Sequence, residues 1–82
     1  MPISGVTILV EEQKTNKALA ELKNYDRVTT YGIHKNNYIV AVLEANTINE
    51  LEVISNKILD EIDGVLGVYP AYVNYQDDDS EK

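Results

Sequence analysis

The segment from Thr47 to Gly64 constrains the fold most strongly, because it predicts one helix with both of its ends marked. Thr47 and Glu50 have the spacing of a capping box, in which the threonine caps the helix and the glutamate reaches back toward its start. A glycine follows at position 64, where we expect the residue that ends a helix. Between these ends, apolar residues recur at spacings of three and four and form one stripe: Leu51, Ile54, Ile58 and Ile62.

Segments rich in β-branched and apolar residues surround this helix and predict strands. The sequence YIVAVLEA, residues 38–45, precedes the helix, and a strand from about Val65 to about Tyr75 follows it. The first half of the chain predicts a strand at 3–10, a short amphipathic helix at 14–24, a strand at 27–33 with a bulge at Gly32, and a turn at 34–37.

The predicted order is therefore β-α-β-β-α-β. Two right-handed crossover units joined by a hairpin give an α+β, ferredoxin-like sandwich. We expect a four-stranded antiparallel sheet of order 4-1-3-2, with both helices on one face. With 82 residues the chain has room for one such domain, residues 1–75, and we expect the acidic tail 76–82 to be disordered.

Composition excludes several classes of function. The net charge of −7 argues against nucleic-acid binding, because phosphates require a basic surface. Without cysteine the chain has neither disulfides nor thiolate metal ligands. The one histidine, His34, falls in a predicted turn, and no serine has a histidine partner implied by the sequence. We therefore predict no catalytic residues and no metal, and a protein that is not an enzyme.

The sequence predicts a protein of the cytoplasm. No apolar run approaches the roughly 18–20 residues of a membrane span, so we expect no stable membrane insertion. The start, MPISGVTILVEEQ, lacks a basic region and predicts a mature strand rather than an export signal.

The sheet face that the helices leave uncovered, called the open face below, is the main functional clue. Glu44 should avoid the core, which places alternate residues of its strand on the open face with it. Leu66 and Val68 of the last strand are then predicted to face the core. The residues expected to form a shallow trough for an amphipathic helix or extended peptide, with small residues in the middle and tyrosines at the sides, are Gly5, Thr7, Leu9, Tyr31, Tyr38, Val40, Val42, Gly67 and Tyr69. A homodimer that buries this face, or ordinary exposure of apolar atoms, explains the same pattern.

Acidic residues are predicted at the rim of the sheet. Glu11 and Glu12 follow the first strand and should lie near Asp63, whereas Glu44 lies at the opposite rim. Such a rim suits arginine or lysine side chains of a partner. A solvated acidic surface is the simpler interpretation of each residue by itself.

Three stretches of the chain resemble the NapD family: ISGVTILV, YIVAVLEANTINELEVISNKI and IDGVLGVYPAYVNYQ. NapD proteins are small cytoplasmic chaperones of the catalytic subunit of periplasmic nitrate reductase. The resemblance implies a ferredoxin-like fold that binds the twin-arginine signal peptide of that subunit and delays export until the molybdenum cofactor is inserted. It implies no cofactor for the chaperone itself.

Two alternatives remain. One is an ACT-like regulatory module that binds a ligand and dimerises through its sheet. A glycine-rich loop after the first strand would favour it, and the sequence EEQKTN contains none. The other is an enzyme of the acylphosphatase type, which the single arginine, Arg27, disfavours. We expect a monomer, because a peptide chaperone keeps its binding face free.

Overall fold

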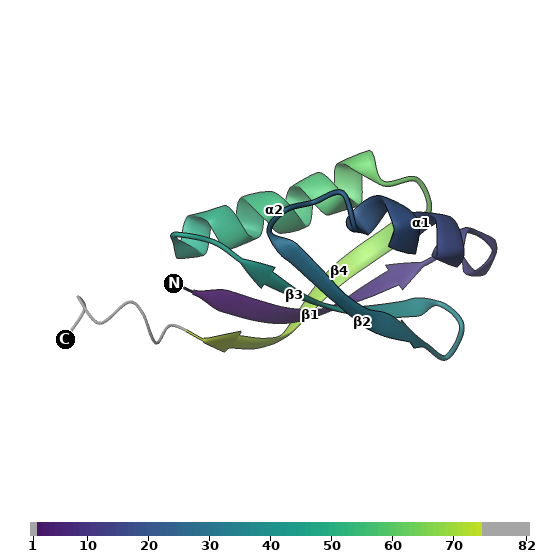
Figure 1. Cartoon of the computed structure of the whole chain (residues 1–82), viewed down its shortest axis with the longest axis horizontal. Coiled ribbons are helices and arrows are strands. Elements are labelled where there is room, and N and C mark those ends of the chain that lie inside the picture. The colour runs from purple at the N-terminus through teal and green to yellow at the C-terminus, as the bar shows by residue number, and fades with distance from the viewer. Residues whose placement is uncertain (1, 75–82) are drawn as a thin grey trace.

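The computed structural model describes the backbone of residues 2–74 and the side chains of residues 2–71 (Figure 1). The expected tail at 76–82 and the predicted strand end at Tyr75 lie outside the described residues. The elements in chain order are β1 (Ile3–Val10), the 3₁₀ turn η1 (Glu12–Lys14), α1 (Thr15–Leu22), β2 (Val28–His34), β3 (Tyr38–Glu44), α2 (Ile48–Glu61) and β4 (Val65–Asn74).

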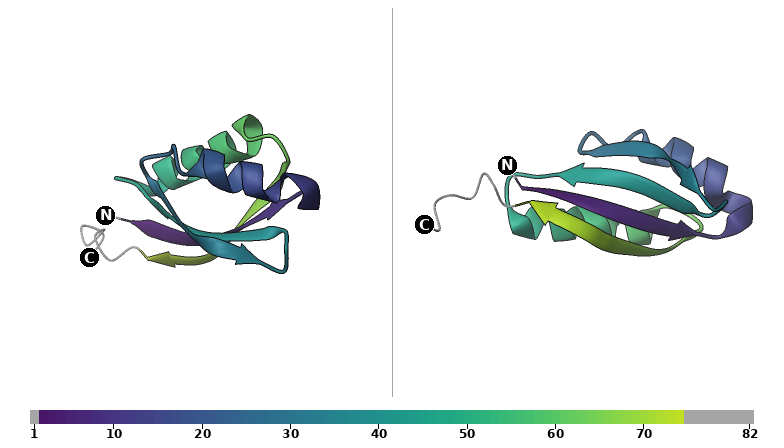
Figure 2. Two further views of the ribbon diagram at one scale, coloured as in Figure 1. Left: turned by 45° about the vertical axis from the view of Figure 1, so that its right-hand side comes forward. Right: turned by 90° about the horizontal axis from the view of Figure 1, so that it is seen from below.

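The four strands form one antiparallel sheet of order β2-β3-β1-β4. Both helices lie on the same side of this sheet (Figures 1 and 2). The predicted ferredoxin-like fold and strand order are confirmed, and β1 and β3 are the two central strands.

The ends of α2 follow from the residues that mark them. Thr47 Oγ1 accepts a hydrogen bond from Glu50 N at 3.1 Å, as in the predicted capping box. Glu50 Oε1 accepts a hydrogen bond at 3.0 Å from the backbone N of Asn46, the residue before the N-cap, rather than from Thr47 itself. At the other end the cap is Ile62 rather than Gly64. Gly64, with φ +95°, instead belongs to the turn into β4, in which Val65 N donates to Ile62 O at 3.2 Å.

The first helix is shorter than the predicted 14–24 at both ends. Lys14 belongs to the 3₁₀ turn η1, and the helix ends at Leu22, after which Asn24 N donates to Glu21 O at 3.0 Å. Thr15 is buried at the junction of η1 and α1. Its Oγ1 donates to Glu11 O and Glu12 O at 3.2 and 3.1 Å, which satisfies carbonyl groups where the chain turns from β1 into the helix.

The core fills the space between the sheet and the helices. Along β1 every second residue is buried, as expected for a strand with one face packed against helices. Ile8, Ile39 and Ile58 are fully buried and come from β1, β3 and α2. The predicted apolar stripe of α2 is confirmed, with Leu51, Ile58 and Ile62 in the core and Ile54 packed against it.

A bulge in β4 makes one predicted orientation wrong. Val10 pairs with Val65 while the preceding Leu9 pairs with Gly67, so Leu66 is an extra residue on β4. Val65 therefore occupies the core position, and Leu66, predicted to face the core, is 56% exposed. Val68 packs against the core as predicted.

The predicted irregularity at Gly32 in β2 is confirmed. Thr30 pairs with Ala41 and Ile33 with Ile39, which leaves Tyr31 and Gly32 opposite Val40. Gly32 has φ +112°, a backbone conformation that glycine adopts readily.

Candidate functional site: the open face of the sheet

The open face is the side of the sheet that neither helix covers (Figures 1 and 2). Figure 2 (right) views the sheet from this side, with the helices behind the strands. The pairing of β1 with β3 and β4 arranges its residues in rows across the sheet. From one end to the other the rows are Glu44 with Ile3; Val42 with Gly5 and Thr29; Val40 with Thr7 and Tyr69; and Tyr38 with Leu9 and Gly67.

Apolar side chains on this face are accessible, in contrast to those on the helix side of the same strands. Val40 is 41% exposed and Tyr69 is 54% exposed, whereas Ala41 and Ile39, which flank Val40 along β3, are fully buried. Tyr31 is 67% exposed in the bulge of β2. The open face therefore offers apolar area that an apolar ligand would remove from water, at about 25 cal/mol per Å².

The small residues of the face lie on the strands where they were predicted. Gly5 and Thr7 are on the central strand β1, and Gly67 is on the edge strand β4. Gly67 is buried, and a Cβ atom placed on it would lie 2.6 Å from Tyr69 Cζ. The ring of Tyr69 thus covers Gly67 instead of standing beside it as a wall. Tyr38 is half-buried at one end of the face, beside Leu9.

Several cavities among the described residues lie away from this face. One of about 500 Å³ lies between α2 and the β4 edge, where Leu51, Val68 and Pro70 contribute to its lining. Another of about 380 Å³ lies beside the α1–β2 connection, lined in part by Tyr25 and Arg27. The apolar side chains of the open face follow one another along β1 and β3, an arrangement that suits an elongated ligand laid along the strands.

Three of the four predicted rim acids gather at the end of β1, where lysines accompany them. Glu11 N donates to Gly64 O at 2.8 Å, which places Glu11 beside the turn that contains Asp63. Lys14 Nζ lies 3.1 Å from Asp63 Oδ1, and Lys17 Nζ lies 3.7 Å from Asp63 Oδ2. The hydrogen bond from Lys14, with its charge, lowers the pKa of the Asp63 carboxyl below its usual value.

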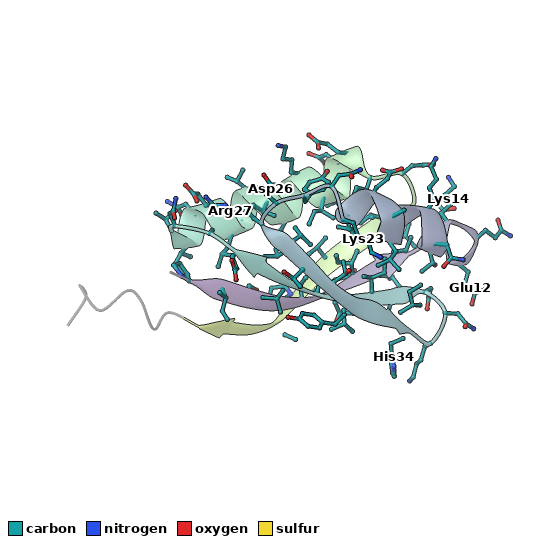
Figure 3. All side chains as sticks on the ribbon, in the orientation of Figure 1. Glu12, Lys14, Lys23, Asp26, Arg27 and His34 are labelled. Carbon is teal, nitrogen blue, oxygen red and sulfur yellow. The ribbon has the colours of Figure 1, made fainter. Side chains whose placement is uncertain are left out.

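The sequence analysis did not identify Lys14, because its contact with Asp63 spans 49 residues. Lys14 also packs its aliphatic stem against the same turn, since a Cβ on Gly64 would lie 2.7 Å from Lys14 Cβ. Glu12 is exposed near this end, as Figure 3 shows together with Lys14.

Glu44 lies at the other end of the sheet, as predicted. It pairs with Ile3, it is exposed, and its backbone N donates to Arg27 O at 2.9 Å. Figure 3 shows Arg27 and Asp26 near this end, in the connection that leads into β2. The four rim acids are thus divided between two opposite ends and do not form one cluster.

Within residues 2–71, no group of three His, Cys, Asp or Glu side chains is placed to hold a metal ion. His34 is exposed at the end of β2, next to a turn in which Lys35 and Asn36 have positive φ. No helix among the described residues is long and apolar enough to cross a membrane.

The described residues form a ferredoxin-like α+β sandwich in which neither helix covers one face of the sheet (Figure 2). The sequence matches the family model described as NapD protein over residues 1–78, and the chain belongs to the NapD family. No curated protein and no solved structure matches it. NapD is a family of chaperones, not a known enzyme family, and membership supports a general role in the maturation of nitrate reductase.

Proposed function

We propose that this protein binds the twin-arginine signal peptide of the periplasmic nitrate reductase catalytic subunit on its open face. Binding delays export of that subunit until the molybdenum cofactor has been inserted. The observation that carries the proposal is the row of accessible apolar side chains, Val40 and Tyr69 above all, on a sheet face that no helix covers.

The chemistry of such a peptide matches the surface. A signal peptide of this class joins two arginines to an apolar segment. The apolar segment would displace water from Val40, Val42 and Leu9, and this burial supplies most of the affinity. A carboxylate at one end of the sheet would meet the guanidinium groups through charge-assisted hydrogen bonds, which affect the orientation of the peptide more than its affinity.

The protein acts by binding alone. It needs no cofactor and no catalytic residue, and it works in the cytoplasm as a monomer, before the partner is exported. A face used for a transient peptide has to remain free in the absence of that peptide. This requirement distinguishes the proposal from an ACT-like regulatory module, which would occupy the same face with a second copy of the chain.

Calorimetric titration with a synthetic twin-arginine signal peptide tests the proposal. Val40→Asp places a charge in the centre of the open face and is expected to weaken binding at least tenfold. Val53→Asp is the matched control, because Val53 is 60% exposed on α2, on the other side of the sheet. Replacing both peptide arginines by lysine should weaken binding, since lysine lacks the planar fork that pairs with a carboxylate.

Equal loss in both valine variants, or no saturable binding by wild-type protein, would contradict the proposal. Sedimentation of the unliganded protein provides the second readout. A tight dimer whose contact buries the open face would favour the regulatory module instead.

A further inference from the structure

The two ends of the open face differ in charge. At the end where β1 runs into η1, Val10 N donates to Asn37 O at 3.0 Å, so the β2–β3 turn lies there too, and we call it the hairpin end. Glu11, Glu12 and Asp63 give this end its negative charge. Three lysines of the same region oppose it: Lys14, Lys17 and Lys35.

The ion pairs at the hairpin end involve one of its carboxylates, that of Asp63. Asp63 lies within 4 Å of two lysine Nζ atoms. The pKa of Lys14 is raised first by its hydrogen bond to Asp63 and then by the charges of Asp63 and Glu11. An arginine arriving at this end would therefore also meet the ammonium groups of Lys14 and Lys17, although Glu11 and Glu12 take part in neither ion pair.

The opposite end, called the Glu44 end, has a different balance. Glu44 is exposed on the open face and takes part in neither of the ion pairs found among the described residues. Arg27 lies at this end but lines a cavity on the helix side with Lys57 and Glu61. Ile3 pairs with both Glu44 and Asn74, so β4 also ends here.

Apolar residues occupy the length of the face between the two ends. Glu44 and Tyr38 are six residues apart on β3, which corresponds to about 20 Å along a strand. A helical segment of about 13 residues has this length. An apolar segment that begins beside Glu44 can therefore run over Val42 and Val40 to Tyr38.

The geometry points to one polarity for the bound peptide: its basic segment lies at the Glu44 end, and its apolar segment runs toward the hairpin end. Glu44 is then the carboxylate on the open face that binds an arginine of the peptide. The inference rests on the proposed function and specifies how that same site reads its ligand.

Paramagnetic labelling of the peptide tests the polarity directly. The protein has no cysteine, so a nitroxide on a single cysteine of the peptide is the only label in the complex. A label beside the arginines is expected to broaden the amide signals of Ile3 and Glu44 in the ¹⁵N-labelled protein. A label at the far end of the apolar segment is expected to broaden those of Leu9 and Tyr38. The reverse pattern overturns the inference while leaving the proposed function intact.

Two matched substitutions test the role of Glu44. Glu44→Gln is expected to weaken binding of the twin-arginine peptide about fivefold and to remove most of the preference for arginine over lysine. Glu11→Gln removes the same charge from another exposed position and is expected to change the affinity less than twofold. A larger loss with Glu11→Gln contradicts the inference. If the wild-type protein binds no peptide at all, the proposed function fails and this inference fails with it.

Discussion

The ring of Tyr69 lies over Gly67, two residues earlier on the same edge strand. A Cβ atom placed on Gly67 would lie 2.6 Å from Cζ and 2.7 Å from Cε2 of that ring, so the space beside the glycine is already filled. An aromatic side chain that covers a glycine in an edge strand shields backbone that glycine alone would leave bare. A ligand on the open face therefore meets the half-exposed Tyr69 ring at β4 rather than the backbone of Gly67.

This arrangement predicts a ring-current shift of the Gly67 Hα protons. Their proton resonances should lie upfield of ordinary strand values and return toward them in Tyr69→Leu. Tyr31→Leu is the control, because Tyr31 lies across the sheet in β2. Unshifted Gly67 protons in the wild-type protein would show that the ring does not rest on the glycine in solution.

A comparison of Gly64 with Gly32 separates two effects of an alanine substitution: backbone strain at positive φ, and steric overlap of the added Cβ with a neighbouring side chain. Both have positive φ, which costs roughly 1–2 kcal/mol for an L-residue. A Cβ at Gly32 meets nothing within 4 Å, whereas one at Gly64 would lie 2.7 Å from Lys14 Cβ. We predict that Gly32→Ala lowers the free energy of unfolding by about 1–2 kcal/mol and that Gly64→Ala lowers it further.

Urea unfolding of the two variants measures the difference. Equal losses would mean that Lys14 moves aside without cost. A smaller loss for Gly64→Ala than for Gly32→Ala would contradict the packing of Lys14 against the α2–β4 turn.

The sequence predicted the fold well, because its strongest signals are local. The Thr47–Glu50 capping box and the stripe of α2 depend only on neighbouring residues, and strand alternation identified Val40 and Val42 as open-face residues. The predicted orientation of Leu66 was wrong because a bulge exchanges the two faces for the residues on one side of it. The sequence of one strand does not reveal its register with the neighbouring strand. The engagement of Asp63 by Lys14 was missed for a related reason: it depends on a contact between distant segments.

The corrected register of β4 makes its own prediction. Leu66→Ala removes a side chain that is 56% exposed, so it should change the free energy of unfolding by about 0.5 kcal/mol or less. Leu43→Ala is the matched comparison, because Leu43 is fully buried, and it should cost about 2–5 kcal/mol. Chemical unfolding of both variants measures these changes. A large loss of stability in Leu66→Ala would indicate that Leu66 faces the core and that β4 has no bulge there.

The Lys14–Asp63 pair predicts a pH dependence with a definite sign. The pKa of Asp63 is lowered from 3.8, so the stability that the pair contributes is present above that pH and is lost as the pH falls through the folded-state value. In an NMR titration the carboxyl of Asp63 should titrate below 3.8 and return toward this value in Lys14→Met. Lys23→Met, at the residue that caps the far end of α1, is the control and should leave the midpoint in place.

Tyr25 predicts a second pH effect, at the alkaline side. Burial, assisted by the hydrogen bond that its phenol donates to Glu61 Oε1 at 2.8 Å, raises the pKa of Tyr25 to about 12. The stability associated with the neutral phenol is complete below the ordinary pKa of 10.0 and is lost as the pH rises through about 12. Tyrosinate absorbance of the wild-type protein minus that of Tyr25→Phe isolates this group, and a midpoint near 10 would contradict its assignment.

Chemical-shift mapping of the bound signal peptide tests the central claim most directly. The ¹⁵N-labelled protein is titrated with the twin-arginine peptide while its amide signals are followed. The proposed function predicts the largest changes at Gly5, Thr7 and Val40, in the middle of the open face, and small changes at Val53 on α2. Changes concentrated on α1 and α2, with the strand residues of the open face unmoved, would contradict it.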